Sequence, residues 1–122
     1  MNRVVHFEIP ADDPEKAARF YSDVFSWRMD KWEGPVDYWL ATTGEEGEPG
    51  INVAIMRRES PESGVSNTID VASIDEMLEK VTAAGGDIVA PKMPVPGVGW
   101  AAYFKDPEGN TFGLMEEDEA AA

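Results

Sequence analysis

Hydrophobic residues alternate with polar ones near the start of the chain and then recur at helical spacing. In residues 4–9, VVHFEI, one face is apolar and the other carries His6 and Glu8, which predicts a half-buried strand. The Asp-Asp-Pro sequence at residues 12–14 supplies a helix cap and a proline for the first helical position. Apolar residues then recur three and four positions apart through residues 17–25. We therefore predict a strand followed by an amphipathic helix.

Three further strands complete the first half of the chain. Their β-rich segments lie at residues 27–30, 37–43 and 51–57. A Gly-Pro pair at 34–35 and the acidic, glycine-rich segment 44–50 separate them, and both are typical of turns. The pattern therefore predicts one strand, one helix and three strands.

A second strand–helix pair follows a polar segment. Residues 58–66 have no hydrophobic periodicity, so we interpret them as a linker. Residues 67–71 predict a strand, and the segment 73–76 has the sequence of a capping box that begins a helix. A Gly-Gly pair at 85–86 is the expected end of that helix.

The remaining residues predict a strand, a loop and a hairpin. The strand lies at residues 87–90, and the proline- and glycine-rich residues 91–99 are expected to form a flap over one mouth of the fold. That flap is either a mobile lid or a loop held rigid by its prolines. Residues 100–104 and 111–115 pair as a hairpin, because Asp-Pro-Glu-Gly-Asn at 106–110 is a turn sequence.

The order of one strand, one helix and three strands therefore occurs twice, which indicates an internal duplication. An offset of 62 residues places His6 on Thr68 and Glu8 on Asp70. If the duplication is symmetric, the two carboxylates point toward one cavity. We expect a single domain made of module one at residues 1–57, the linker at 58–66, module two at 67–117 and a frayed acidic tail at 118–122.

Charge and composition exclude several classes of protein. Among 122 residues, 24 are acidic and 10 are basic, which gives a net charge of −14. Because nucleic acids and anionic membranes both require basic patches, neither is an expected partner. The chain has no cysteine, which excludes disulfides, thiolate metal sites and a cysteine nucleophile. No signal sequence or membrane span is visible, so we expect a cytoplasmic protein.

Three segments together resemble the vicinal oxygen chelate superfamily, which includes glyoxalases, bleomycin-resistance proteins and extradiol dioxygenases. They are the strand HFEIP with the helix ending FYSDVFSW, the helix ending AAGG, and the hairpin DPEGNTFGLME. The resemblance covers essentially the whole chain. It implies an α+β fold in which two tandem βαβββ modules form a cupped, barrel-like mixed sheet with a helix outside each module. It also implies a homodimer, and a divalent metal that chelates two oxygens of a substrate.

The metal ligands that this resemblance implies are mostly missing. The glyoxalase pattern has a His on the first strand and a Glu on the last strand of each module. His6 matches the first position, but Thr68 and Gly113 occupy the positions in module two, and residues 54–56 offer no carboxylate. We therefore expect no metal and no other cofactor, and leave a weakly bound divalent metal as the alternative. An extradiol site needs two histidines, and this chain has one.

Proton transfer and ligand binding are the remaining candidate roles. His6 could act as a base with Glu8 or Asp70, since two nearby carboxylates raise one another's pKa. Alternatively, His6 is structural and the carboxylates pair with arginines. Aromatic rings in the second half of each module could stack on a flat ligand, or belong to the core or a dimer interface. The expected ligand-binding residues are His6, Glu8, Trp39, Met56, Thr68, Asp70, Trp100, Phe104 and Gly113.

Three functions are consistent with these residues. The first is a metal-free protein that binds a small, flat or amphipathic organic molecule, as the resemblance to bleomycin-resistance proteins implies. The second is a glyoxalase-related lyase or isomerase, in which His6 works with Glu8 or Asp70 in proton transfer beside a carbonyl. The third is a structural or partner-binding module with a vestigial cleft.

Overall fold

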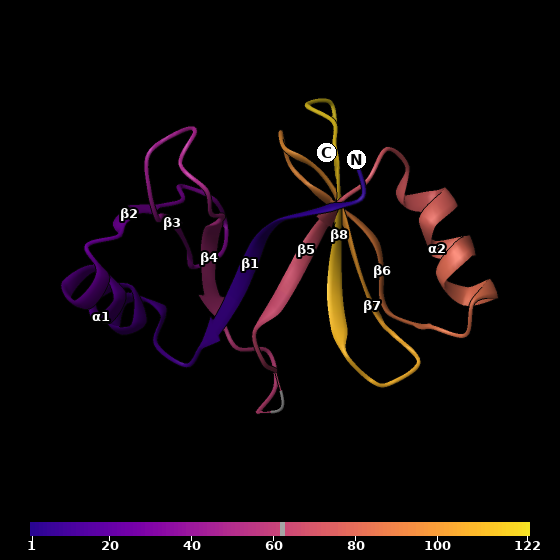
Figure 1. Ribbon diagram of the computed structural model, residues 1–122, viewed down its shortest axis with the longest axis horizontal. Helices are drawn as coiled ribbons and strands as arrows, with labels where there is room; N and C mark the ends of the chain where they lie inside the picture. The colour runs from indigo at the N-terminus through magenta and orange to yellow at the C-terminus, as the bar shows by residue number, and fades with distance from the viewer. Residues whose placement is uncertain (62) are drawn as a thin grey trace. The chain divides into compact units, whose positions relative to one another are not determined.

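The chain divides into two units that share the first strand. The structure is a computed structural model that describes residues 1–61 and 63–122. The N-terminal unit comprises residues 6–66, and the C-terminal unit comprises residues 67–122 together with residues 1–5. Figure 1 shows a helix and several strands in each unit. Each unit is described by itself below.

The N-terminal unit is a four-stranded sheet with one helix. Its strands have the spatial order β2-β3-β4-β1, and only the β1–β4 pair is parallel. This arrangement is a βαβββ module, as the sequence predicts. The elements are β1 (Arg3–Ala11), α1 (Pro14–Phe25), β2 (Arg28–Lys31), β3 (Tyr38–Thr42) and β4 (Asn52–Arg57).

The C-terminal unit repeats this connectivity. Its strands have the order β6-β7-β8-β5, and the first and last strands of the module, β5 and β8, again pair in parallel. The mixed α+β class and the two βαβββ modules are therefore confirmed, whereas the cupped, barrel-like shape of the sheet stays a prediction. The elements are β5 (Ser66–Asp70), α2 (Ile74–Ala83), β6 (Asp87–Val95), β7 (Gly99–Lys105) and β8 (Thr111–Glu117).

Both helices begin and end where the local sequence predicts. Asp13 caps α1 and accepts a hydrogen bond from the backbone N–H of Lys16 at 3.2 Å. Ser73 caps α2 in the same way through the N–H of Glu76. Gly85 follows α2 with a φ of +96°, a conformation that favours glycine. Within residues 1–61 and 63–122, no helix is long and apolar enough to cross a membrane.

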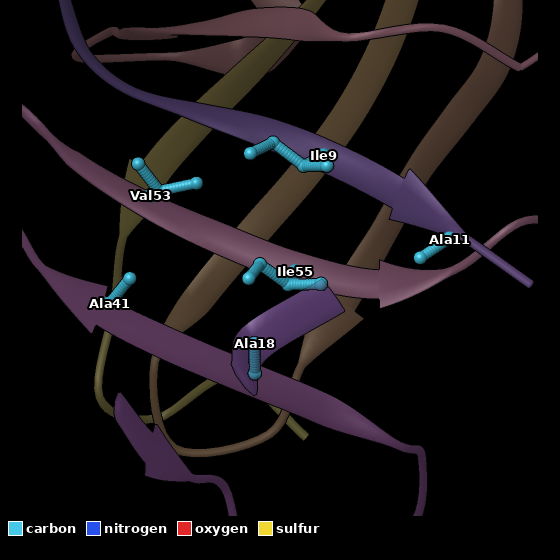
Figure 2. Close-up of a cluster of buried hydrophobic side chains, with 6 residues drawn as sticks. All are labelled: Ile9, Ala11, Ala18, Ala41, Val53 and Ile55. Carbon is cyan, nitrogen blue, oxygen red and sulfur yellow. The ribbon is translucent and has the colours of Figure 1, made fainter. Parts of the chain in front are cut away.

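A buried apolar cluster joins α1 to one face of its sheet. Ile55 on β4 is fully buried, and it lies beside Ile9 on β1 and Trp39 on β3. Because neighbouring residues of paired strands point to the same face, these three side chains share the face that α1 covers. Figure 2 shows the cluster, whose members are Ile9, Ala11, Ala18, Ala41, Val53 and Ile55.

A second cluster joins α2 to the sheet of the C-terminal unit. Ile74 at the start of α2 is fully buried against Ala102 of β7 and Leu114 of β8. The backbone N–H of Ile74 also donates to Glu116 Oε1 at 2.9 Å, so a strand carboxylate satisfies the start of this helix. Each sheet therefore has one helix-covered face, and we call the opposite face the helix-free face.

The turn between β7 and β8 lies at residues 106–110, as the sequence predicts. Asp106 Oδ1 accepts hydrogen bonds from the backbone N–H groups of Glu108 and Asn110, at 2.8 and 2.9 Å. The Asn110 side chain donates to the second carboxylate oxygen, and this bond is the main reason that the pKa of Asp106 lies below its ordinary value. Gly109 has a φ of +87°, which the turn requires.

The prediction of a flap at residues 91–99 is wrong. β6 continues to Val95 and pairs with β7, with Met93 opposite Ala101 and Val95 opposite Gly99. Two prolines lie within this strand, but β6 is the last strand of its sheet and therefore needs hydrogen bonds on one side only. Register shifts between Ile88 and Met93 accommodate the irregular backbone.

The acidic tail is bound to its unit instead of frayed. The Asp118 carboxylate accepts a hydrogen bond from Trp100 Nε1 at 3.1 Å, which lowers the pKa of Asp118. The Ala121 carbonyl accepts from the N–H of Gly97, and Ala121 itself is buried. The acidic composition of the tail predicts fraying, but backbone hydrogen bonds to the β6–β7 turn hold residues 118–121 in place.

Arg58 holds the first part of the predicted linker against the N-terminal unit. Its backbone N–H donates to the Ala11 carbonyl, and its guanidinium contacts Asp12 Oδ1 at 3.3 Å. The same guanidinium donates to the Ser63 carbonyl at 2.6 Å. Residue 62 of the linker lies outside the described residues. This segment therefore has specific contacts despite its polar sequence.

Candidate functional site

Buried polar side chains are concentrated on the first strand of each module. Among the described residues, the buried polar or charged side chains are Glu8, Ser66 and Thr68, with exposed fractions of 8%, 8% and 3%. The neighbours Ile9 and Ile69 pack toward the helix-covered faces, so all three polar side chains point to the helix-free faces. Because burying polar groups is costly, these faces are the candidate functional surfaces.

Glu8 is the buried carboxylate of the N-terminal unit. Its Oε1 accepts a hydrogen bond from Ser66 Oγ at 3.5 Å. Tyr38 of β3 lies on the same face, opposite Met56 in the register of β3 and β4. Burial, with a further contribution from the charge of Glu8, raises the pKa of Tyr38 to about 12. The phenol therefore stays protonated at physiological pH and can donate a hydrogen bond.

His6 lies two residues before Glu8 on the same face of β1. Its side chain is half-buried, and desolvation lowers its pKa below the ordinary value of 6.5. The imidazole is therefore neutral at pH 7 and can accept a proton. Its neighbour in the register is Asn52, whose side-chain oxygen accepts a hydrogen bond from the N–H of Thr43 at 3.0 Å.

The helix-free face of the C-terminal unit is tightly packed around Gly113. Thr68 lies beside Gly113 on β5 and β8, and Tyr103 lies beside it on β7. A Cβ atom at Gly113 would lie 3.1 Å from Tyr103 Cε1 and 3.2 Å from Thr68 Oγ1. The Tyr103 ring therefore occupies the space that a side chain at position 113 would need. Asp70 follows Thr68 on the same face, beside Met115.

The structure divides the predicted site residues between two units and two faces. His6, Glu8 and Met56 lie on the helix-free face of the N-terminal unit. Thr68, Asp70 and Gly113 lie on that of the C-terminal unit. The expectation that Glu8 and Asp70 point toward one cavity stays a prediction.

Three aromatic residues of the predicted ligand-binding set lie on the helix-covered faces. Trp39 lies opposite Ile55 and packs against the cluster under α1. Trp100 and Phe104 pack against the cluster under α2. All three rings therefore pack against the core clusters from the helix-covered side, and their contact with a ligand stays a prediction.

Sequence reasoning missed Tyr38 as a residue of the candidate surface. Residues 38–41, Tyr-Trp-Leu-Ala, are all apolar or aromatic, so no polar position indicates which alternate side chains face the helix. Only the register of β3 with β4 assigns the faces of β3. It places Ala41 opposite the buried Val53, on the face that α1 covers. Tyr38 and Leu40 then belong to the helix-free face.

The two core tryptophans give a matched stability prediction. Trp39 Nε1 is buried and has no hydrogen-bond partner among the described residues, whereas Trp100 Nε1 donates to Asp118. Trp39→Phe should change the free energy of unfolding by no more than about 1 kcal/mol, because it also removes an unsatisfied buried donor. Trp100→Phe should be less stable than Trp39→Phe in urea denaturation at pH 7. Equal midpoints for the two variants would contradict this assignment.

The residues present do not fit the divalent metal that the resemblance implies. Thr68 and Gly113 occupy two of the ligand positions, and β4 presents Ala54 and Met56 on the helix-free face. At Gly113 a side chain would press on Tyr103 and Thr68, at 3.1 and 3.2 Å from its Cβ atom. In the part of the chain that the structure describes, no group of three or more His, Asp or Glu side chains is placed to hold a metal ion.

A shallow depression of about 460 Å³ lies elsewhere in the N-terminal unit, beside the start of α1. Its wall includes Phe20, which is 56% exposed, and Arg58, which is bound to Asp12. The depression is wide open, and none of the predicted site residues lines it. The helix-free faces therefore remain the candidate surfaces.

Comparisons with known proteins agree with this arrangement. A family model described as the Glyoxalase/Bleomycin resistance protein/Dioxygenase superfamily matches residues 3–114. A glyoxylase-like domain-containing protein of Didymella fabae is 33% identical over 115 residues, which cover 88% of each chain. The chain spans about half of the anthracycline biosynthesis protein DauV of Streptomyces, with 28% identity over 132 residues, 93% of this chain and 48% of that protein.

A solved structure is similar over nearly the whole chain. Methylmalonyl-CoA epimerase from Mycobacterium tuberculosis has a TM-score of 0.71 and 15% identity, over 94% of this chain and 87% of that one. At this identity the likeness shows the fold alone.

Proposed function

The chain belongs to the glyoxalase/bleomycin resistance protein/dioxygenase superfamily, and from that premise we propose that it binds a small organic molecule on its helix-free faces. The observation that supports this most is the burial of Glu8, Ser66 and Thr68 on these faces. A protein that needed only a stable sheet could fill these positions with apolar side chains at less cost. Polar groups among apolar residues are typical of sites that orient a small ligand.

We further propose that binding does not depend on the divalent metal of related proteins. His6 is the only residue that matches the implied ligand set, and a side chain at position 113 would press on Tyr103 and Thr68. On the N-terminal unit, a hydrogen bond from Tyr38 and the charge of Glu8 would then orient the ligand. Two copies of the chain are expected to pair, as the superfamily resemblance implies.

A thermal-shift screen of small metabolites tests the proposed function. At 100 times its Kd, a ligand adds about 2.7 kcal/mol to the free energy of unfolding and so raises the melting temperature. The set should include aromatic acids, amines, sugars and acyl-CoA thioesters. Glu8→Gln should reduce the shift of a ligand that binds the N-terminal unit, and Thr68→Val that of a ligand that binds the C-terminal unit. The exposed Val65→Ala should leave either shift unchanged.

Two results would contradict this proposal. If no compound raises the melting temperature, the chain is better described as a structural or partner-binding module. Stoichiometric metal in protein purified without a chelating tag, lost on His6→Ala, would contradict the metal-free part.

The neutral imidazole of His6 favours a second candidate, a lyase or isomerase reaction. Desolvation lowers the pKa of His6, so the side chain is available as a base at pH 7, with Glu8 on the same face of β1. Such a reaction would exchange the hydrogen next to a carbonyl with solvent. Deuterium uptake by a bound ligand in D₂O would distinguish the enzyme from a simple binding protein.

A further inference from the structure

Helix α1 of the N-terminal unit has an apolar side that faces away from its sheet. Ala18 packs into the buried cluster, on the side of α1 that contacts β3 and β4 (Figure 2). Phe20 and Val24 lie four residues apart and therefore share another side of the helix, where each is 56% exposed. We call this side the outer face of α1. Large apolar side chains that are exposed together mark interaction surfaces in soluble proteins.

The exposed Phe20 belongs to a continuous group of aromatic rings. Its ring centroid lies 5.2 Å from that of Tyr21, and the two ring planes meet at 88°. Tyr21 in turn stacks on Trp27, with the centroids 5.3 Å apart. The ring of Phe25, which is also 56% exposed, lies 5.5 Å from that of Trp27. The half-buried Tyr21 and Trp27 hold the exposed rings in place, which reduces the entropy lost when another surface contacts them.

The depression beside the start of α1 adjoins Phe20. It has a volume of about 460 Å³, and Phe20, Tyr21 and the β1 residue Ile9 belong to its wall. Its rim is partly neutralised, because Arg58 pairs with Asp12 at 3.3 Å. A hollow this open would leave much of a small molecule in water, but it can receive an aromatic side chain of another protein. A protruding ring and a hollow that can receive it therefore lie side by side.

A protruding ring beside a hollow is a self-complementary surface. In a twofold symmetric pair every contact is made twice, so Phe20 of each copy can enter the depression of the other copy. Phe20 also lies close to the middle of α1, which runs from Pro14 to Phe25. Two copies of α1 can therefore cross in an antiparallel manner with Phe20 at the crossing point.

The charged residues around Phe20 match this arrangement. Lys16 lies one turn before Phe20, and Asp23 lies near the other end of α1. Both are exposed, and neither forms an ion pair with any other residue that the structure describes. In an antiparallel crossing, Lys16 lies beside the partner's Asp23, and symmetry forms this pair twice. The nearby Glu15 and Arg19 pair with each other at 3.8 Å, so they add no net charge.

We propose that two copies of the chain associate through the outer face of α1, with Phe20 at the centre of the interface. The superfamily resemblance implies a homodimer but does not specify this surface. A second copy is favoured over an unrelated protein because the protruding ring, the depression and the two opposite charges all belong to the same chain. The outer face of α1 points away from the sheet, so the helix-free face of the N-terminal unit stays open to a ligand.

Sedimentation equilibrium measures this association directly. Between about 1 and 200 µM, the unchanged chain should form a dimer whose dissociation constant is micromolar or lower. Phe20→Ala removes the protruding ring and should raise this constant at least about tenfold. Circular dichroism and thermal unfolding of each variant show whether it is folded.

Val24→Lys and Val36→Lys are a matched pair of variants. The two valines are exposed to nearly the same extent, 56% and 58%, but Val36 lies between β2 and β3, outside α1. Both substitutions reduce the net negative charge by one, so each weakens the general repulsion between two acidic chains to the same extent. Val24→Lys should raise the dissociation constant of the dimer about tenfold, whereas Val36→Lys should not raise it.

Charge reversal tests the antiparallel arrangement. Lys16→Glu and Asp23→Lys should each weaken the dimer about tenfold, because each places like charges together at two symmetric positions. The double variant restores opposite charges across the interface and should recover most of the affinity. Lys16 and Asp23 are about 10 Å apart along the axis of one helix, so this recovery reports a contact between copies.

A monomer at every concentration would overturn this interface. So would a dimer whose dissociation constant is the same in folded Phe20→Ala and Val24→Lys, because such a dimer forms through another surface. A double charge variant that stays as weak as the single variants would overturn the antiparallel arrangement. The metabolite screen tests the helix-free faces separately, so its failure counts against the proposed function and not against this interface.

Discussion

Ile55→Ala is expected to lower the free energy of unfolding by about 2–5 kcal/mol. Ile55 has an exposed fraction of 0%, and it contacts the cluster that joins β1, β3 and β4 to α1. Truncation removes buried methyl groups and leaves a cavity that neighbouring strands cannot fill without moving. Urea denaturation with the unchanged protein as reference measures the loss.

Two further variants test the physical cause. Ile55→Val removes one methylene group and should cost only about 0.5–1.5 kcal/mol. Val65→Ala, at a side chain that is 63% exposed, should stay within about 0.5 kcal/mol of the unchanged protein. Similar losses for Ile55→Ala and Val65→Ala would contradict the placement of Ile55 at the centre of this cluster.

Gly113→Glu should lower the free energy of unfolding by roughly 3–5 kcal/mol, although it restores the carboxylate that the superfamily resemblance implies. The new Cβ would press on Tyr103 and Thr68, at 3.1 and 3.2 Å. The carboxylate would also be placed at a buried position without a designed partner. Gly113→Ala, which adds only the methyl group, should cost about 1–3 kcal/mol.

Gly64→Glu is the control for this prediction. No atom lies within 4 Å of a Cβ built at Gly64, so the same substitution should be nearly neutral there. Thermal and urea unfolding measure both variants, and added Mn²⁺ or Ni²⁺ should not raise the stability of Gly113→Glu. A stable Gly113→Glu that gains stability with metal would show that position 113 retains room for a ligand.

The packing of Tyr103 beside Gly113 matters as much as the identity of the residue at position 113. The sequence shows that Gly113 lacks a side chain, but it does not show whether the space beside it is open. The structure places the Tyr103 ring there, beside Thr68. Position 113 is therefore tightly packed against an aromatic ring.

The residues that form the candidate site were partly predictable. His6 and Glu8 alternate with apolar residues in β1, so their shared face could be derived from the sequence. The face of Tyr38 could not be assigned, because the aromatic and aliphatic residues of β3 are compatible with either orientation. The register of β3 with β4 decides which of them face α1.

The sequence by itself determined the features that depend on neighbouring residues. Helix caps such as Asp13 and Ser73, the turn at Asp106 and the repeated βαβββ order all follow from short-range preferences. These features form through backbone and side-chain contacts within a few residues, so a local pattern is sufficient to predict them.

Tertiary structure alone decided the features that depend on pairing. β6 includes its prolines because it is an edge strand, and the tail is bound because Trp100 and Gly97 are beside it. The register of β3 with β4 places Trp39 against the buried cluster and Tyr38 on the helix-free face. A shift of one residue would exchange their faces, and only burial against the helix selects between the two registers.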